Sequence, residues 1–254
     1  MSQQINIRFY GELNDFLVQN QCDADFDVEL KKVRSVKDLI ESVGIPHTEI
    51  DVIIVNGESV GFNYQVHPGD NISVYPVFDS LHDSIFIDPS ALHHCQPKQL
   101  GDTRFVLDVH LGRLAAYLRM LGFDTLYKND FDDPTLADIS ADEHRILLTC
   151  DRLLLMRKQI SHGCFVRNRQ PQKQLQEILS RFGLYDELKP FTRCIHCNGI
   201  TQPVEKHAIE TQLLPKTKKY YNEFFQCNSC KKIYWKGSHY LKMKEMINSV
   251  KTMC

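Results

Sequence analysis

Residues 145–155 read RILLTCDRLLL, and this stretch decides how the middle of the chain folds. The apolar run ILLT is typical of a buried strand, and residues 151–160 have the composition of a helix that follows it directly. Asp151 stands at the junction, where an aspartate serves either as a helix cap or as a metal ligand. A strand that leads at once into a helix is the repeating unit of a parallel sheet. The stretch therefore predicts an α/β unit around Asp151.

The same alternation extends over residues 104–190. Helices of roughly 10–15 residues between the strands predict a parallel sheet with helices on both faces. The expected strands are 104–108, 124–127, 145–150 and 164–167, and the expected helices are 110–122, 132–144, 151–160 and 171–184.

Three aspartates occupy informative places in this pattern. Asp108 ends the first strand, Asp133 opens a later helix and Asp151 follows the strand ILLT. Ligands of such sheets bind outside the carboxyl ends of the strands, so we expect the three to converge there. Clustered carboxylates repel one another without a cation, which predicts a Mg²⁺ or Mn²⁺ site. Each acid alone fits a helix cap equally well, and either Asp132 or Asp133 fits the cap of its helix.

Residues 1–80 have a different pattern, in the order strand, strand, helix, strand, strand. Ser35 is the expected N-cap of the helix and Gly44 its C-terminal stop. Asn56 and Gly57 favour a tight turn within the third apolar stretch. This order is typical of a β-grasp domain, and residues 81–103, which are rich in turn formers, are the expected linker.

Two CxxC pairs, CIHC at 194–197 and CNSC at 227–230, lie in the C-terminal segment. Two such pairs complete a tetrahedral shell of four thiolates, and aromatic strands flank the second pair. The spacing predicts a structural zinc ribbon over residues 191–254, with Cys194, Cys197, Cys227 and Cys230 as ligands. A closed shell leaves no open coordination position, so catalysis is left to the acids.

Charge is distributed unevenly along the chain. Residues 1–90 carry five basic and 15 acidic side chains, whereas residues 191–254 carry 11 basic and four acidic ones. Lysines interleaved with aromatic residues attract a phosphate backbone and stack unpaired bases, although aromatics also fill the small core of a ribbon. We expect RNA contacts from Lys231, Lys232, Lys236 and, at the start of its helix, Arg152.

The N-terminus has no basic segment followed by an apolar one, and no apolar run reaches membrane-spanning length. A cytoplasmic protein without membrane attachment is the expectation. In a reducing compartment the nine cysteines are not expected to form disulfides.

Three stretches together resemble the Mut-seven carboxy-terminal RNase family, a PIN-like nuclease domain joined to a zinc ribbon. They are FVLDVHLGRLAAYLRMLGFDTLY (105–127), DDPTLADISADEHRILLTCDRLLL (132–155) and FQCNSCKKIYWKGSHYLKM (225–243). The resemblance places the family's three acids on Asp108, Asp133 and Asp151, and Cys150 stands where the family commonly has arginine. It implies metal-dependent endonucleolytic cleavage of RNA.

The N-terminal segment resembles ubiquitin-like, sulfur-carrier-like domains through VNGESVGFNYQVHPGDNISVYPVF (55–78). Sulfur carriers end in a free diglycine, but this chain continues with DSLHDSIF, so we expect a docking role toward a protein partner instead.

The sequence thus predicts a β-grasp domain (1–80), a linker (81–103), a PIN-like α/β nuclease domain (104–190) and a zinc ribbon with a C-terminal tail (191–254). The predicted function is that of a metal-dependent endoribonuclease. Two alternatives stay open. One is a non-catalytic RNA-binding or ribosome-associated adaptor in which the acids are caps. The other is a toxin-like PIN nuclease controlled by a partner, with the acidic N-terminal domain acting as a decoy for the basic ribbon.

Overall fold

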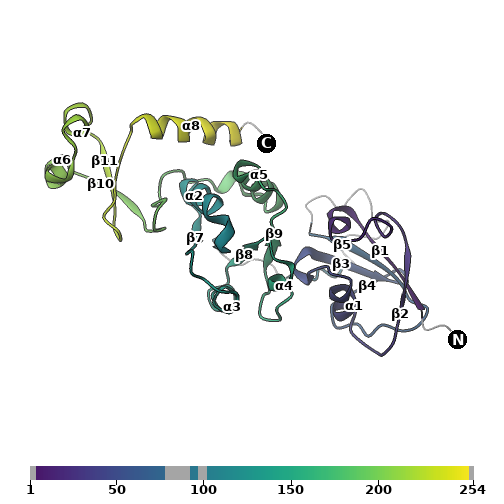
Figure 1. The fold of residues 1–254 in the computed structure, drawn as a ribbon. Coiled ribbons are helices and arrows are strands. Elements are labelled where there is room, and N and C mark those ends of the chain that lie inside the picture. Colours follow the sequence, from purple (N-terminus) through teal and green to yellow (C-terminus); the bar gives the residue numbers. More distant parts are fainter. Residues whose placement is uncertain (1–3, 78–91, 97–101, 252–254) are drawn as a thin grey trace. The chain divides into compact units, whose positions relative to one another are not determined.

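The computed structural model describes residues 4–77, 92–96 and 102–251 (Figure 1). The chain divides into two compact units. Unit 1 combines residues 1–102 with residues 131–167, and unit 2 combines residues 103–130 with residues 168–254. Among the helices of the described residues, none has the length and apolar composition needed to cross a membrane.

A five-stranded sheet forms the N-terminal part of unit 1. Its order is β2-β1-β5-β3-β4, with β1 parallel to β5 and the other neighbours antiparallel. The helix α1 follows β2 in the chain. This topology confirms the predicted β-grasp fold. The elements are β1 (Gln4–Phe9), β2 (Phe26–Glu29), α1 (Val36–Ser42), β3 (Ile50–Val55), β4 (Glu58–Val60) and β5 (Asn71–Pro76), with 3-10 turns at Gly11–Phe16 and His47–Glu49.

Local signals in this domain behave as the sequence predicts. The Ser35 side chain accepts a hydrogen bond from Asp38 N and caps α1. Gly44, with φ of +100°, follows the end of the helix. Asn56 and Gly57, with φ of +51° and +89°, turn the chain between β3 and β4. Because both turn residues need positive φ, the Asn-Gly pair fits this hairpin.

Parallel strand pairs occur in both units. In unit 2, β6 (Arg104–Leu107) pairs with β7 (Asp124–Leu126). In unit 1, β8 (Ile146–Thr149) pairs with β9 (Gly163–Phe165). Three helices lie between successive strands, α2 (Gly112–Met120), α3 (Asp133–Asp142) and α4 (Arg152–Leu155), and α5 (Pro171–Arg181) follows β9. Parallel strands joined by helices confirm the α/β prediction for this region.

The helix after Asp151 is shorter than its composition suggested. α4 ends after a single turn, and the backbone N–H of Met156 bonds back to the carbonyls of Arg152 and Leu153. Ile160 N then bonds to Arg157 O and closes a separate turn. The carbonyl of Ile160 accepts from His47 in the N-terminal domain, so a tertiary contact replaces helix propagation here.

A three-stranded antiparallel sheet, in the order β10-β11-β12, forms the ribbon of unit 2 (Figure 1). The C-terminal tail folds into a helix, α8, which buries Ile247 and Val250. The elements are β10 (Thr201–Val204), α6 (Lys206–Ile209), α7 (Pro215–Tyr220), β11 (Phe224–Cys227), β12 (Ile233–Trp235) and α8 (Ser238–Lys251).

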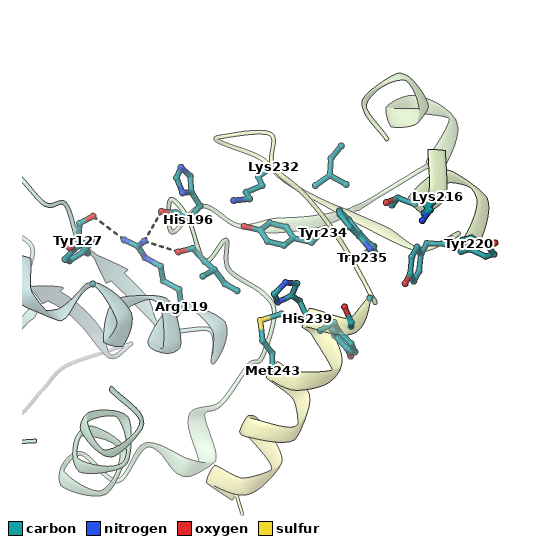
Figure 2. Close-up of a pocket in the computed structure, with 18 of the residues that line it drawn as sticks. Arg119, Tyr127, His196, Lys216, Tyr220, Lys232, Tyr234, Trp235, His239 and Met243 are labelled. Carbon is teal, nitrogen blue, oxygen red and sulfur yellow. Dashed lines mark hydrogen bonds between the residues drawn. The ribbon is translucent and has the colours of Figure 1, made fainter. Parts of the chain in front are cut away.

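Unit 2 also contains a cavity of about 1330 Å³ (Figure 2). Its walls come from the start of α2, the segment after β7, the first CxxC turn, α7, β12 and the first turns of α8. Segments that are far apart in the sequence therefore line the same cavity.

Candidate functional site

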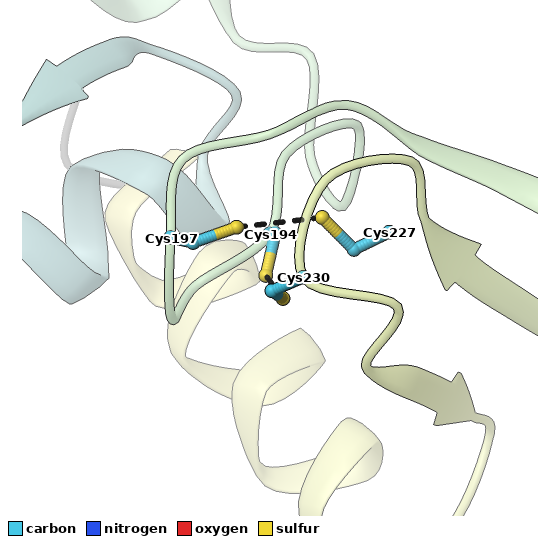
Figure 3. Close-up of side chains that lie close together, drawn as sticks. All are labelled: Cys194, Cys197, Cys227 and Cys230. Carbon is cyan, nitrogen blue, oxygen red and sulfur yellow. Dashed lines mark hydrogen bonds between the residues drawn. The ribbon is translucent and has the colours of Figure 1, made fainter.

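Four cysteine sulfurs come together in unit 2 (Figure 3). The Sγ atoms of Cys194 and Cys230 lie 3.6 Å apart, and those of Cys197 and Cys227 lie 3.4 Å apart. All four sulfurs lie within 4.8 Å of one another. A tetrahedral zinc ion with Zn–S bonds of about 2.3 Å spaces its ligands about 3.8 Å apart, whereas a disulfide is about 2.05 Å long. The cluster therefore fits one zinc ion and does not fit two disulfides.

Two tight turns carry these cysteines. Cys194 N donates to Gly199 O at 2.7 Å, and Cys227 N donates to Lys232 O at 3.0 Å. A Cβ atom at Gly199 would lie 2.6 Å from Ser229 Oγ and 2.9 Å from Cys227 Sγ. Only glycine lets the two turns approach this closely, so the position just after the first CxxC pair is part of the metal site.

The protonation of the thiols also favours a cation. Burial raises the pKa of Cys194, but hydrogen bonds from the Tyr234 hydroxyl, 3.0 Å away, and from backbone amides lower it overall to about 7. Burial and hydrogen bonds to neighbouring thiols raise the pKa of Cys230 to about 12. Adjacent thiols thus resist ionising together, and a dication that binds thiolates removes this conflict.

Arg119 on α2 braces the first CxxC turn from within unit 2. Its buried guanidinium donates to Thr125 O at 2.9 Å, to His196 O at 3.0 Å and to Ile195 O at 3.2 Å (Figure 2). Burial lowers the pKa of Arg119, while the nearby cysteine sulfurs favour its charged form. Arg119 could not be recognised from the sequence, because nothing in the helical pattern around it marks an arginine that donates to backbone carbonyls.

Asn198 is a second brace that sequence reasoning missed. Its side chain accepts from Thr125 N at 3.0 Å and donates to Asp124 Oδ1 at 2.8 Å. Arg193 completes the network through Asp124, at 3.2 Å. The φ of +71° at Asn198 suits asparagine, which tolerates the left-handed region. Side-chain hydrogen bonds and an ion pair therefore connect the first CxxC turn to the start of β7.

The predicted acids lie in both units. Asp108 directly follows β6 in unit 2, where its side chain is buried and its carbonyl accepts from Leu111 N. Asp151 directly follows the turn after β8 in unit 1, where it is exposed and its Oδ1 accepts from Leu153 N at 2.8 Å. Each thus follows the carboxyl end of a strand in a parallel pair, as expected. Their predicted common Mg²⁺ or Mn²⁺ site stays a prediction.

The structure separates the roles of the two aspartates at α3. Asp132 is the N-cap, and its side chain accepts from Thr135 N at 3.0 Å. Hydrogen bonds to Thr135 lower the pKa of Asp132. Asp133 is the first helical residue, and its Oδ2 lies 3.7 Å from Arg157 Nη2. Because Asp132 supplies the cap, the capping explanation does not account for Asp133.

Arg152, which we predicted to contact RNA, binds the N-terminal domain within unit 1. Its Nη1 donates to Phe16 O at 3.0 Å and its Nη2 to Asp15 O at 3.3 Å. The guanidinium also stacks over the rings of Phe16 and Phe165, at 4.7 and 5.6 Å from their centroids. Cation–π contacts and carbonyl acceptors hold it in this place.

A second arginine strengthens the same contact. Arg167 Nη2 lies 2.8 Å from Oε2 of Glu49, whose side chain is completely buried, and its Nε lies 3.1 Å from Asp15 Oδ2. Phe165 N donates to Oε1 of Glu49 at 2.8 Å. The N-terminal domain is therefore bound to the segment that contains α4 and β9 through buried polar contacts.

The lysines predicted to bind RNA differ in their surroundings. Lys231 Nζ donates to Asn228 O at 2.8 Å, and Lys236 forms an ion pair with Glu223. Lys232 lines the cavity of unit 2 and is exposed. The three lysines, which could not be told apart in the sequence, therefore differ in their contacts.

Comparison with protein families gives two matches. The Mut7-C RNAse domain model matches residues 103–247, and the Mut7-C ubiquitin model matches residues 2–82. The comparisons with curated proteins and with solved structures gave no match. The two matches agree with the α/β region, the four-cysteine cluster and the N-terminal five-stranded sheet described above. The chain therefore belongs to the Mut7-C RNase family and carries that family's ubiquitin-type domain at its N-terminal end.

Proposed function

We propose that this protein is a ribonuclease that hydrolyses phosphodiester bonds of RNA and depends on Mg²⁺ or Mn²⁺. The match of the Mut7-C RNAse domain over residues 103–247 carries the proposal and points to a nuclease-type function. The positions of Asp108 and Asp151 directly beyond strands β6 and β8 support it, because ligands of parallel sheets bind at carboxyl ends.

The proposed catalytic residues are Asp108, Asp133 and Asp151. Carboxylate oxygens suit Mg²⁺ or Mn²⁺, and such an ion, when bound, lowers the pKa of water and neutralises charge on the attacked phosphate. The hydrogen bond from Leu153 N fixes one oxygen of Asp151 and orients the carboxylate. Asp133 is available for this role because Asp132 caps α3.

Zinc has a structural role in this proposal. The four cysteines can complete a closed shell, and the braces from Arg119 and Asn198 tie the first CxxC turn to α2 and β7. Of the ribbon lysines predicted to bind RNA, Lys232 is kept in the set that contacts the RNA backbone, whereas Lys231 and Lys236 bind Asn228 and Glu223. We exclude Arg152 from this set, because its guanidinium binds Phe16 and Asp15.

The test is RNA cleavage by the full-length protein with and without added Mn²⁺. Asp108→Asn, Asp133→Asn and Asp151→Asn should each lower the cleavage rate about 100-fold or more, as expected for loss of a group that stabilises the transition state. Asp138→Asn is the matched control, because Asp138 is an exposed acid on α3 outside the proposed set. Equal losses in Asp138→Asn and Asp151→Asn would contradict the assignment.

A non-catalytic RNA-binding adaptor is the second candidate. Asp132 and Asp151 both act as N-caps, and a capping role needs no metal ion. An adaptor binds RNA in the same assay but releases no Mn²⁺-dependent products, and Asp151→Asn then affects only helix stability. The presence or absence of cleavage by the unmodified protein separates the two functions.

A further inference from the structure

The charged residues that line the cavity of unit 2 are mostly basic, and aromatic rings accompany them. Lys128, Lys216 and Lys232 lie along its wall, and Asp130 is the acidic residue of the lining. Tyr220, Tyr221, Tyr234, Trp235 and Tyr240 supply its rings. Figure 2 shows side chains from α7 (Lys216, Tyr220) and from β12 (Tyr234, Trp235) around the cavity, together with Arg119 and Tyr127. A positive wall with aromatic faces complements a polyanion that carries planar bases.

The cations of this region fall into two groups. Arg119 is buried and donates to backbone carbonyls of the CxxC turn, so it holds the protein itself together. Lys231 and Lys236 do not line this cavity and bind Asn228 and Glu223. Lys128, Lys216 and Lys232 line the cavity and are exposed. They are the cations placed to meet phosphate groups there.

Two of the rings are unusually open to solvent. Tyr220 is 67% exposed, although large aromatic side chains normally bury most of their area, and Trp235 is 37% exposed. Trp235 is packed beside Tyr221, with the ring centroids 6.3 Å apart. A Cβ atom at Gly237 would lie 2.9 Å from Trp235 Nε1, so glycine gives the indole its space. An exposed ring held from one side offers its other face to a stacking partner.

The volume and the ring geometry favour one kind of ligand. About 1330 Å³ exceeds the roughly 300–1,000 Å³ of typical small-molecule sites, so the hollow accommodates several nucleotides. In an RNA duplex the base faces are covered by neighbouring bases, whereas an unpaired strand leaves them free to stack on protein rings.

We infer that this cavity binds an unpaired segment of RNA, with bases stacked on Trp235 and Tyr220 and phosphates bound by Lys216 and Lys232. The choice of RNA as the polyanion rests on the proposed function, whereas the position of the binding site rests on the cavity alone. The zinc ribbon then binds single-stranded RNA within unit 2, which also contains Asp108.

Tryptophan fluorescence tests this inference directly, because Trp235 is the only tryptophan of the chain. The full-length Asp151→Asn variant is titrated with single-stranded oligoadenylate of about ten nucleotides, without added Mg²⁺ or Mn²⁺. The single strand should quench Trp235, and raising the salt should weaken binding. The same strand annealed to its complement should bind weakly and leave the fluorescence unchanged. Equal binding of the duplex overturns the inference.

Two neighbouring lysines provide the matched comparison. Lys232→Gln should weaken binding about three- to tenfold near 0.1 M salt and make the slope of log affinity against log salt shallower by about 0.7. Lys231→Gln should stay within about twofold of the parent. Lys216→Gln, on α7, repeats the test away from the cysteines, and zinc content checks that each variant folds. Unchanged affinity in both Lys232→Gln and Lys216→Gln overturns the inference.

The two proposals fail in different ways. RNA cleavage by the unmodified protein without any quenching of Trp235 overturns the binding site and leaves the nuclease intact. Quenching and the expected lysine effects without Mn²⁺-dependent cleavage support the binding site and overturn the proposed nuclease.

Discussion

Glu49→Gln tests the buried ion pair that binds the N-terminal domain to the segment carrying α4 and β9. Glutamine has the size of glutamate but lacks its charge. Glu49 accepts from Arg167 Nη2 through one oxygen and from Phe165 N through the other, both at 2.8 Å. The amide group of glutamine has one acceptor and one donor end, so it must place N–H against one of these donors.

The cost follows from burial. Removing one partner of a buried ion pair costs about 3–5 kcal/mol, because the remaining charge has lost its counterion. The Arg167 side chain is 18% exposed and still has the Asp15 carboxylate 3.1 Å away. Because partial exposure and this second carboxylate both reduce the cost, we expect Glu49→Gln to lower the free energy of unfolding by about 3 kcal/mol, the lower end of that range. For a chain of this length such a loss lowers the melting temperature by about 6–12 °C.

Circular dichroism melts of the full-length protein provide the assay, and hydrogen exchange at Phe165 N locates the change. Glu223→Gln is the control, because its ion pair with Lys236 joins side chains that are 69% and 51% exposed. Ion pairs between such exposed side chains contribute little to stability, because solvent screens them. In the double variant Glu49→Gln/Arg167→Met the losses should not add, since the second change removes the guanidinium that has lost the Glu49 carboxylate. Equal melting temperatures for Glu49→Gln and Glu223→Gln would refute the reasoning.

Two further predictions concern the zinc site and the remaining thiols. Gly199→Ala should lower zinc content measured on the purified protein, because its Cβ would crowd the sulfur of Cys227, whereas Gly44→Ala, where no atom lies within 4 Å, should retain full zinc even though the φ of Gly44 is positive. Burial raises the pKa of Cys95 to about 12, so the thiolate is scarce at pH 8 and alkylation there should be much slower than at the exposed Cys150. Mass spectrometry of labelled peptides measures this order, and equal rates would contradict it.

Features that depend on local chemistry were predictable from the sequence. The Ser35 cap, the Asn56-Gly57 turn and the spacing of the CxxC pairs each involve residues within a few positions of one another. Hydrophobic periodicity likewise predicted the β-grasp order and the parallel strands. An element that is buried on one face has apolar residues at the regular spacing of a helix or a strand, and a strand that is buried on both faces is a continuous apolar run. The family resemblance added the identity of the candidate acids, which composition alone left open.

The sequence by itself thus determined the domain types of this protein and the four cysteines that could hold a zinc ion. Tertiary structure alone decided that α4 stops after one turn, and that Arg152 and Arg119 bind backbone carbonyls far along the chain. Arg152 reaches Phe16 across 136 positions, and Arg119 reaches His196 across 77. Such contacts depend on how helices and strands pack against one another. The sequence does not show whether an arginine will bind a phosphate, a carboxylate or a carbonyl, because its guanidinium can donate to all three.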